Sequence, residues 1–246
     1  MLTGAYQAEQ RQNYGANQKK TKLPIVLCLA VIASIALIAI AVLISSLKPG
    51  SQELKIVDSG WSSTVIEGET KISIGIQVQN TTDAFIAKNI VITGIGYDAN
   101  KNELFKEEQI CVISYVLPGG KASCAGSLLF ETDMQVDSIV FATNEKILSW
   151  TKGDSNKSKT SNSFEIGEIE RDGEDGSISC TVKNNTEKSA NDIRIVLILR
   201  KDGQIVGGTW SSPEEEDIEP GGEGYVILSG FEEVDYDDYE LSVNGI

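Results

Sequence analysis

The sequence predicts an all-β fold: two tandem antiparallel β-sandwiches preceded by one transmembrane α-helix. Three observations lead to this prediction, namely an unbroken uncharged run near the N-terminus, an internal repeat over the rest of the chain, and an apolar–polar alternation in both copies of the repeat. The predicted segments, in chain order, are a disordered cytoplasmic tail (1–22), the helix (23–47), a juxtamembrane linker (48–53), the first sandwich (54–150), a linker (151–163) and the second sandwich (164–246).

The uncharged run covers residues 23–47 and reads LPIVLCLAVIASIALIAIAVLISSL. A helix of this length reaches about 37 Å, which exceeds the roughly 30 Å hydrocarbon core of a bilayer. It is also longer than a buried core helix of a globular domain needs to be. A cleaved signal peptide would have an apolar region of about 7–15 residues and a small-residue cleavage site. We therefore expect an uncleaved anchor in the lipid bilayer.

Basic residues precede the run, and acidic residues dominate after it. Arg11, Lys19, Lys20 and Lys22 stand against one acid, Glu9, whereas the whole chain carries a formal net charge of −15. Because positively charged flanks stay in the cytoplasm, we expect a single-pass protein of the cell membrane with its N-terminus inside and its C-terminal domains outside. The polar tail, which lacks apolar periodicity, should be disordered. An exterior this acidic would be repelled by nucleic acid, so we expect no such partner.

The exterior is an internal repeat. Residues Ile76–Ile92 match Cys180–Ile195, and a Pro-Gly-Gly sequence follows at a similar distance in both copies, at 118–120 and 220–222. Order and spacing are maintained over about a hundred residues. We therefore expect two copies of one module.

Each copy has the alternation of β-strands. Apolar residues fall at every second position, at Ile72, Ile74, Ile76 and Val78 in the first copy and at Ile178, Cys180 and Val182 in the second. Period two predicts one buried face and one solvent face. Turn-forming residues follow at 80–82 and 184–186. Further strands are expected over 90–97 and 193–200, with hairpin turns at 99–100 and 202–203. Short strands at this spacing predict antiparallel sandwiches.

The motifs of the two repeats resemble those of a known domain family. The order Asn-x-Thr, Ala-x-Asn/Asp-Ile, a strand ending in Tyr97-Asp98, and a Pro-Gly-Gly turn resembles the FxLYD-type domain. Gly94 and Gly96 replace large apolar residues of its motif, and the second copy has Arg200-Lys201 in place of Tyr-Asp. The resemblance implies an immunoglobulin-like sandwich found on bacterial membrane-anchored proteins, and it implies no catalytic residues.

The chain contains no histidine. This excludes Ser-His and Cys-His nucleophile arrangements and every histidine-ligated metal site. Two acidic clusters, 214–217 and 232–238, supply oxygen ligands of the kind that calcium prefers, but neither has EF-hand spacing. We interpret them as solvated loops, with calcium binding as the alternative. We predict no catalytic, cofactor-binding or metal site, and no cofactor.

Two cysteines flank the turn at 118–120. If its arms pair as a hairpin, Cys111 and Cys124 fall roughly opposite each other, within reach of a disulfide bond. An oxidising exterior favours this bond. The alternative is two reduced cysteines, at least one of which fills the core. Cys28 lies in the membrane run, and Cys180 is expected to be a small buried hydrophobe.

Asn80, Asn156 and Asn184 satisfy the Asn-x-Ser/Thr pattern, which marks glycan acceptors in eukaryotes. Because the resemblance points to bacteria, we interpret Asn80 and Asn184 as turn residues and Asn156 as part of the linker. The isolated tryptophans are expected in the core or at domain edges, at Trp61, Trp150 and Trp210.

The predicted function is non-catalytic: a membrane-anchored, extracytoplasmic binding or scaffolding protein of the cell envelope. The expected partner is another envelope protein, contacted through a β-edge or loops; the sequence does not identify a small-molecule ligand. The alternative is an accessory or sensor subunit whose exterior reads a ligand and whose tail contacts a cytoplasmic partner. An enzyme is the third hypothesis.

Overall fold

The computed structural model describes residues 49–50, 53–153, 163–172 and 176–244. Every regular element in these ranges is a β-strand, so the all-β class is confirmed. Within them, no helix has the length and apolar character that crossing a membrane requires. The predicted tail, 1–22, and the predicted membrane helix, 23–47, lie outside the described residues, as does most of the predicted linker 151–163.

The described strands form four antiparallel sheets. In chain order they are β1 (Leu54–Ile66), β2 (Glu69–Asn80), β3 (Phe85–Tyr97), β4 (Glu103–Val116), β5 (Lys121–Phe130), β6 (Ser138–Thr143), β7 (Ser149–Lys152), β8 (Phe164–Arg171), β9 (Ile178–Asn184), β10 (Arg194–Lys201), β11 (Gln204–Ser211), β12 (Glu223–Leu228) and β13 (Asp238–Asn244).

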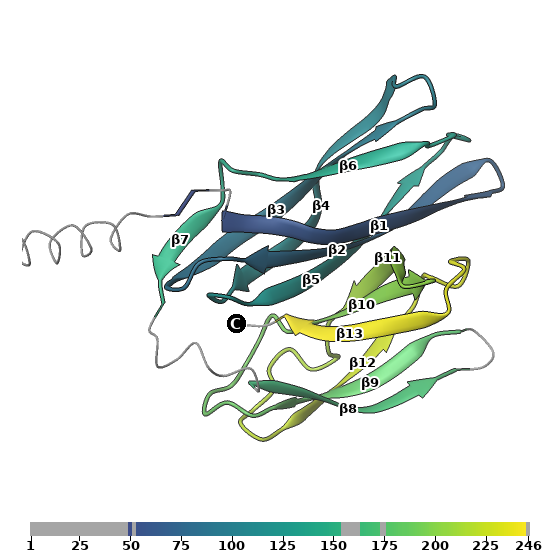
Figure 1. Ribbon diagram of the computed structural model, residues 1–246. Helices are drawn as coiled ribbons and strands as arrows, with labels where there is room; N and C mark the ends of the chain where they lie inside the picture. The colour runs from purple at the N-terminus through teal and green to yellow at the C-terminus, as the bar shows by residue number, and fades with distance from the viewer. Residues whose placement is uncertain (1–48, 51–52, 154–162, 173–175, 245–246) are drawn as a thin grey trace, which may run out of the picture. The chain divides into compact units, whose positions relative to one another are not determined.

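The two halves of the described chain have the same strand order (Figure 1). The first repeat, residues 54–152, contains sheets β1-β2-β5 and β4-β3-β6, with β7 also paired to β3. The second repeat, residues 164–244, contains β8-β9-β12 and β11-β10-β13. The internal repeat is therefore confirmed in the topology. Strand β7 has no counterpart, and it carries the first repeat two residues past the predicted boundary at 150.

Each repeat has an apolar core between its two sheets. The alternating apolar residues of β2 and β9 are fully buried as predicted, at Ile72, Ile74, Ile76, Val78, Ile178, Cys180 and Val182. Opposite them lie side chains of β3 and β4 in the first core, and of β10 in the second. The arrangement in each repeat is that of a β-sandwich.

The predicted turns form for local steric reasons. Asp202 and Gly203 have φ angles of 51° and 78° and join β10 to β11, as a two-residue hairpin of type I′ requires. In the Pro-Gly-Gly turns, Gly119 and Gly221 have φ angles of 69° and 75°. These values are typical of the third position of a type II turn, which favours glycine.

The Asn-x-Thr motif closes the same turn in both repeats. The side-chain nitrogen of Asn184 donates hydrogen bonds to the carbonyl oxygens of Lys188 (2.8 Å) and Ile218 (2.7 Å). Its side-chain oxygen accepts hydrogen bonds from the backbone nitrogen (2.9 Å) and the hydroxyl (2.7 Å) of Thr186. Asn80 makes the same four kinds of bond, with Phe85, Val116 and Thr82. Both asparagines are fully buried, so their amides replace water with protein partners.

The prediction that one face of β2 contacts solvent is wrong. Ser73 is 5% exposed and Gly75 is also buried, because sheet β11-β10-β13 of the second repeat covers sheet β1-β2-β5 of the first. A separate apolar cluster fills this contact, made of Ala125, Val196, Ile198 and Ile205. Strand β9 has no such cover, and its buried residues alternate with partly exposed ones.

Small residues permit the close contact of these two middle sheets. A Cβ atom at Gly60 would overlap the carbonyl oxygen of Ile205, and one at Gly75 would meet that of Gly207. Ser73 forms a reciprocal pair of hydrogen bonds with the backbone of Gly208: its hydroxyl donates to the carbonyl oxygen (3.2 Å) and accepts from the nitrogen (3.0 Å). The repeats are therefore joined by dry packing and buried backbone bonds.

Charged side chains surround the apolar contact. Arg200 Nη1 lies 2.9 Å from Asp58 Oδ2, and Lys71 Nζ lies 3.0 Å from Glu233 Oε2, each pair linking the two repeats. The hydrogen bond from Lys71 lowers the pKa of the Glu233 carboxyl. Because the charged carboxylate is the bonded form, this contact is present at neutral pH and is lost as the pH falls through the lowered pKa.

We expect the substitution Asn184→Ala to lower the free energy of unfolding by about 2–4 kcal/mol, because it removes the four hydrogen bonds of a fully buried amide and leaves the space of that amide empty. The matched control is Asn185→Ala, at the exposed neighbouring position, which should change it by less than about 0.5 kcal/mol. Urea unfolding of the full chain in mild detergent, followed by circular dichroism, measures both. Equal effects of the two substitutions would contradict the role given to Asn184.

Candidate functional site

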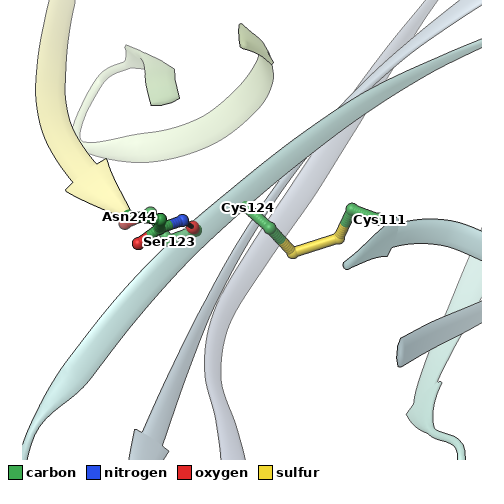
Figure 2. Close-up of a disulfide and its surroundings, with 4 residues drawn as sticks. All are labelled: Cys111, Ser123, Cys124 and Asn244. Atoms are coloured by element: carbon green, nitrogen blue, oxygen red, sulfur yellow. Dashed lines mark hydrogen bonds between the residues drawn. A yellow bond between two sulfur atoms is a disulfide. The ribbon is translucent and has the colours of Figure 1, made fainter. Parts of the chain in front are cut away.

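A disulfide bond joins Cys111 to Cys124, with their Cα atoms 6.0 Å apart (Figure 2). Both residues are buried. Cys111 lies in β4 and Cys124 in β5, so the bond connects the two sheets of the first repeat. The bond holds β4 and β5 together at one edge of the first repeat.

The hairpin from which this pair was predicted does not form. Strand β4 pairs with β3, where Cys111 is opposite Ile92, and β5 pairs with β2, where Cys124 is opposite Ile76. The turn at 118–120 therefore passes from one sheet to the other. The two cysteines approach each other across the core, not across a hydrogen-bonded strand pair.

Cys180 is fully buried and unbonded, as expected for a small core residue. Burial raises the pKa of its thiol, which keeps it protonated and poorly nucleophilic. Trp61 and Trp150 pack against the core of the first repeat. Trp210, in β11, is 46% exposed. The tryptophans thus lie in the core or at an edge, as predicted.

Two adjoining cavities follow the edge formed by β4 and β5, and Asn244 lines both. One, of about 440 Å³, is bounded by the end of β4, the turn at 118–120 and the start of the second repeat. The other, of about 380 Å³, lies beside the disulfide and is bounded by Arg194, Val196 and Trp210. We call the two cavities together the edge groove. Burial raises the pKa of Tyr115, which lines the first cavity, so its hydroxyl remains a neutral donor.

The edge groove is basic, although the chain is acidic. Its charged lining residues are Lys121 and Arg194, and none of the described residues that line either cavity is Asp or Glu. The Arg194 guanidinium lies 4.9 Å from the centre of the Trp210 ring, in a cation–π contact. No ion pair joins Arg194 to a carboxylate in the described ranges. The positive charge is therefore available to a ligand.

The backbone at this edge accepts a donor from outside its own sheet. The side-chain nitrogen of Asn244, at the end of β13, donates a 2.6 Å hydrogen bond to the carbonyl oxygen of Ser123 in β5. Figure 2 shows this contact on one side of β5 and the disulfide on the other. The groove is thus formed by both repeats.

The acidic clusters have structural partners. Glu215 accepts a 3.0 Å hydrogen bond from the backbone nitrogen of Tyr225, and Asp237 accepts one of the same length from that of Asp202. Asp235 pairs with Lys201, and this hydrogen bond raises the pKa of the lysine. In the described part of the chain, no group of His, Cys, Asp and Glu residues is arranged to hold a metal ion.

The buried amides of Asn80 and Asn184 also bear on modification. Each side-chain nitrogen already donates two hydrogen bonds inside the fold. A glycan on either nitrogen would remove one of its two N–H donors, and the fully buried position leaves no room for a sugar. Both residues are thus turn residues, as interpreted from the sequence; Asn156 lies outside the described residues.

The sequence predicted no residue of the edge groove as a binding residue; Cys111 and Cys124 were predicted only as a disulfide pair. Arg194 and Trp210 come from different strands of the second repeat, and Lys121 comes from the first. Because the groove exists only where the repeats meet, no local spacing or motif marks these residues.

Comparisons with known proteins add little to this description. No protein-family model matches the chain, and no curated protein matches it. Among solved structures, the chain is similar to the crystal structure of red sea bream transglutaminase, with 12% sequence identity and a TM-score of 0.26. The match covers 78% of this chain and 29% of the transglutaminase chain. A similarity this distant carries no argument about fold or function.

Thiol counting tests the disulfide. The chain has four cysteines, so alkylation of the unfolded, unreduced protein should label only Cys28 and Cys180, whereas prior reduction should expose all four. Cys111→Ser is the matched control, because it frees Cys124 and should add one labelled thiol without reductant. Mass spectrometry of the intact chain gives the counts. Full labelling of the wild-type chain without reductant would rule out the bond.

Proposed function

We propose that this chain is a non-catalytic binding or scaffolding protein of the cell envelope, anchored in the membrane by residues 23–47. The length and uncharged character of that run support the anchor, and the basic residues before it support a cytoplasmic N-terminus. The Cys111–Cys124 disulfide supports an oxidising compartment for the repeats, since such bonds are rare where thiols are kept reduced.

For each repeat we propose an immunoglobulin-like sandwich of the FxLYD type. The support is the shared strand order, with two antiparallel sheets that enclose one core, together with the Asn-x-Thr and Pro-Gly-Gly elements present in both copies. In immunoglobulin variable domains, loops at one end of such a sandwich form the binding surface.

The observation that carries the binding role is the edge groove. Two repeats packed as one compact unit present strand edges, an exposed tryptophan and an unpaired arginine on a chain whose net charge is −15. Strand edges bind extended segments of partner proteins through main-chain hydrogen bonds. An envelope protein is therefore the partner class that we propose.

The test is proximity labelling in the native cell, with the labelling enzyme fused to the C-terminus of the full chain. The matched control is the same enzyme fused to residues 1–53, which include the anchor but not the repeats. We expect at least one envelope protein to be labelled reproducibly by the full chain and about tenfold less by the control. Equal labelling by both would contradict a binding role for the repeats.

Deletion of residues 1–18 separates this proposal from the sensor alternative. Without this part of the tail, a scaffold should still label the same partner and should still have the effect on the cell that the full chain has. Retention of the partner with loss of the cellular effect would favour a sensor whose tail signals inside the cell.

A further inference from the structure

The edge groove combines three features that act on one kind of ligand. Its charged lining residues are cations, Lys121 and Arg194, whereas the chain as a whole has 36 acidic and 21 basic residues. A basic site on an acidic protein attracts anions locally and repels them elsewhere, which favours specific over diffuse binding. The charge of the groove therefore complements a carboxylate.

The second feature is the free edge of β4. In the described structure this strand has one neighbour in its sheet, β3. Its residues 109–112 line the cavity beside the disulfide, where the Ile110 carbonyl oxygen lies against Gly126 of β5, and its residues 114–116 line the other cavity. At about 3.3 Å per residue, residues 109–116 extend over roughly 26 Å, which is about the length of an extended heptapeptide. The opposite edge, on β5, already accepts the side chain of Asn244 at Ser123. Pairing along the groove therefore falls to β4.

The third feature is Trp210, which is 46% exposed and lies beneath the Arg194 guanidinium. A half-exposed indole beside the buried disulfide provides an apolar surface for one side chain of a ligand. Arginine held over an aromatic ring is restricted in its rotamers, so it loses less entropy when it binds a carboxylate.

We propose that the edge groove binds an extended acidic peptide segment of a partner protein, which pairs with β4 and places a carboxylate on Arg194. The inference rests on the proposed binding function and specifies its site and its ligand chemistry. A polyanion such as a nucleic acid does not fit, because the acidic surface beyond the groove repels it.

Three pools of fluorescent heptapeptides test the ligand chemistry. All alternate apolar and polar positions, and they differ only in whether the central polar residue is Glu, Gln or Lys. Fluorescence anisotropy with the full chain in zwitterionic detergent at low salt gives the dissociation constants. We expect the Glu pool to bind about tenfold more tightly than the Gln pool, and the Lys pool more weakly than both. Equal affinity for the Glu and Gln pools, or no binding of the Glu pool at millimolar concentration, would overturn the proposal.

The chain offers a matched pair of arginine variants. Arg194→Gln should abolish the preference for Glu over Gln. Arg171→Gln should leave the preference intact, because Arg171 is stacked in a similar way on Tyr236, 5.3 Å from its ring centre, but does not line the groove. Equal losses in the two variants would overturn the site. Circular dichroism establishes that each variant is folded, and quenching of Trp210 fluorescence by the Glu pool, absent in Trp210→Phe, provides a second readout of the same site.

Proximity labelling with Arg194→Gln distinguishes failure of this inference from failure of the proposed function. If the wild-type chain and Arg194→Gln label the same partner equally, the edge groove is not the site, although the binding function stands. If the wild-type chain labels no partner above its control, the proposed function itself fails. Loss of the partner in Arg194→Gln, with retention in Arg171→Gln, supports both.

Discussion

The contact between sheets β1-β2-β5 and β11-β10-β13 sets the conditions for the rest of the structure. Two sheet faces approach closely only if the residues between them are small, and this is why Gly60 faces the backbone of Ile205 while Ser73 and Gly75 face Gly207 and Gly208. The buried bonds between Ser73 and the Gly208 backbone require the same closeness. As a result β2 is buried on both of its faces, and the edge groove forms where β5 meets the end of β13.

The contact joins two sheets that do not correspond to each other in the repeat. The sheets that do correspond to them, β8-β9-β12 and β4-β3-β6, lie on the outside, and their sequences differ at the equivalent contact positions. On β12, Tyr225 and Ile227 occupy the places that Ser123 and Ala125 hold on β5, and both are more than 40% exposed. On β4, the register places the exposed Lys106 and the buried Phe105 where β11 has Gly208 and Gly207. Bulky residues on one outer sheet and a charged residue on the other oppose repetition of this close contact, which heterologous packing would otherwise permit.

The sequence predicted correctly those features that depend on residues close together in the chain. The burial of the alternating apolar residues of β2 and β9, the Asp202-Gly203 hairpin and the burial of Cys180 follow from neighbouring residues alone. Non-local choices were not predictable in this way. The turn at Pro118 can join strands of one sheet or of two, and Ser73 and Gly75 suit water as well as a close sheet contact. The edge groove was not predicted, because Arg194 and Lys121 become neighbours only through the packing of the two repeats. Arg200, which stands in place of the Tyr-Asp motif, forms an ion pair with Asp58 across the contact between the two repeats.

Amide hydrogen exchange at Gly208, followed by NMR of the full chain, tests the stacking of the two repeats most directly. Strand β11 is an edge strand, and the partner of the Gly208 nitrogen is the hydroxyl of Ser73 in the other repeat. We expect this amide to exchange as slowly as those of the central strand β10, and to exchange faster in Ser73→Ala but not in Ser127→Ala, whose exposed serine lies opposite Ser73 in the β2–β5 register. Rapid exchange of Gly208 in the wild-type chain, at the rate of an uncovered edge amide, would contradict the stacking and the groove that depends on it.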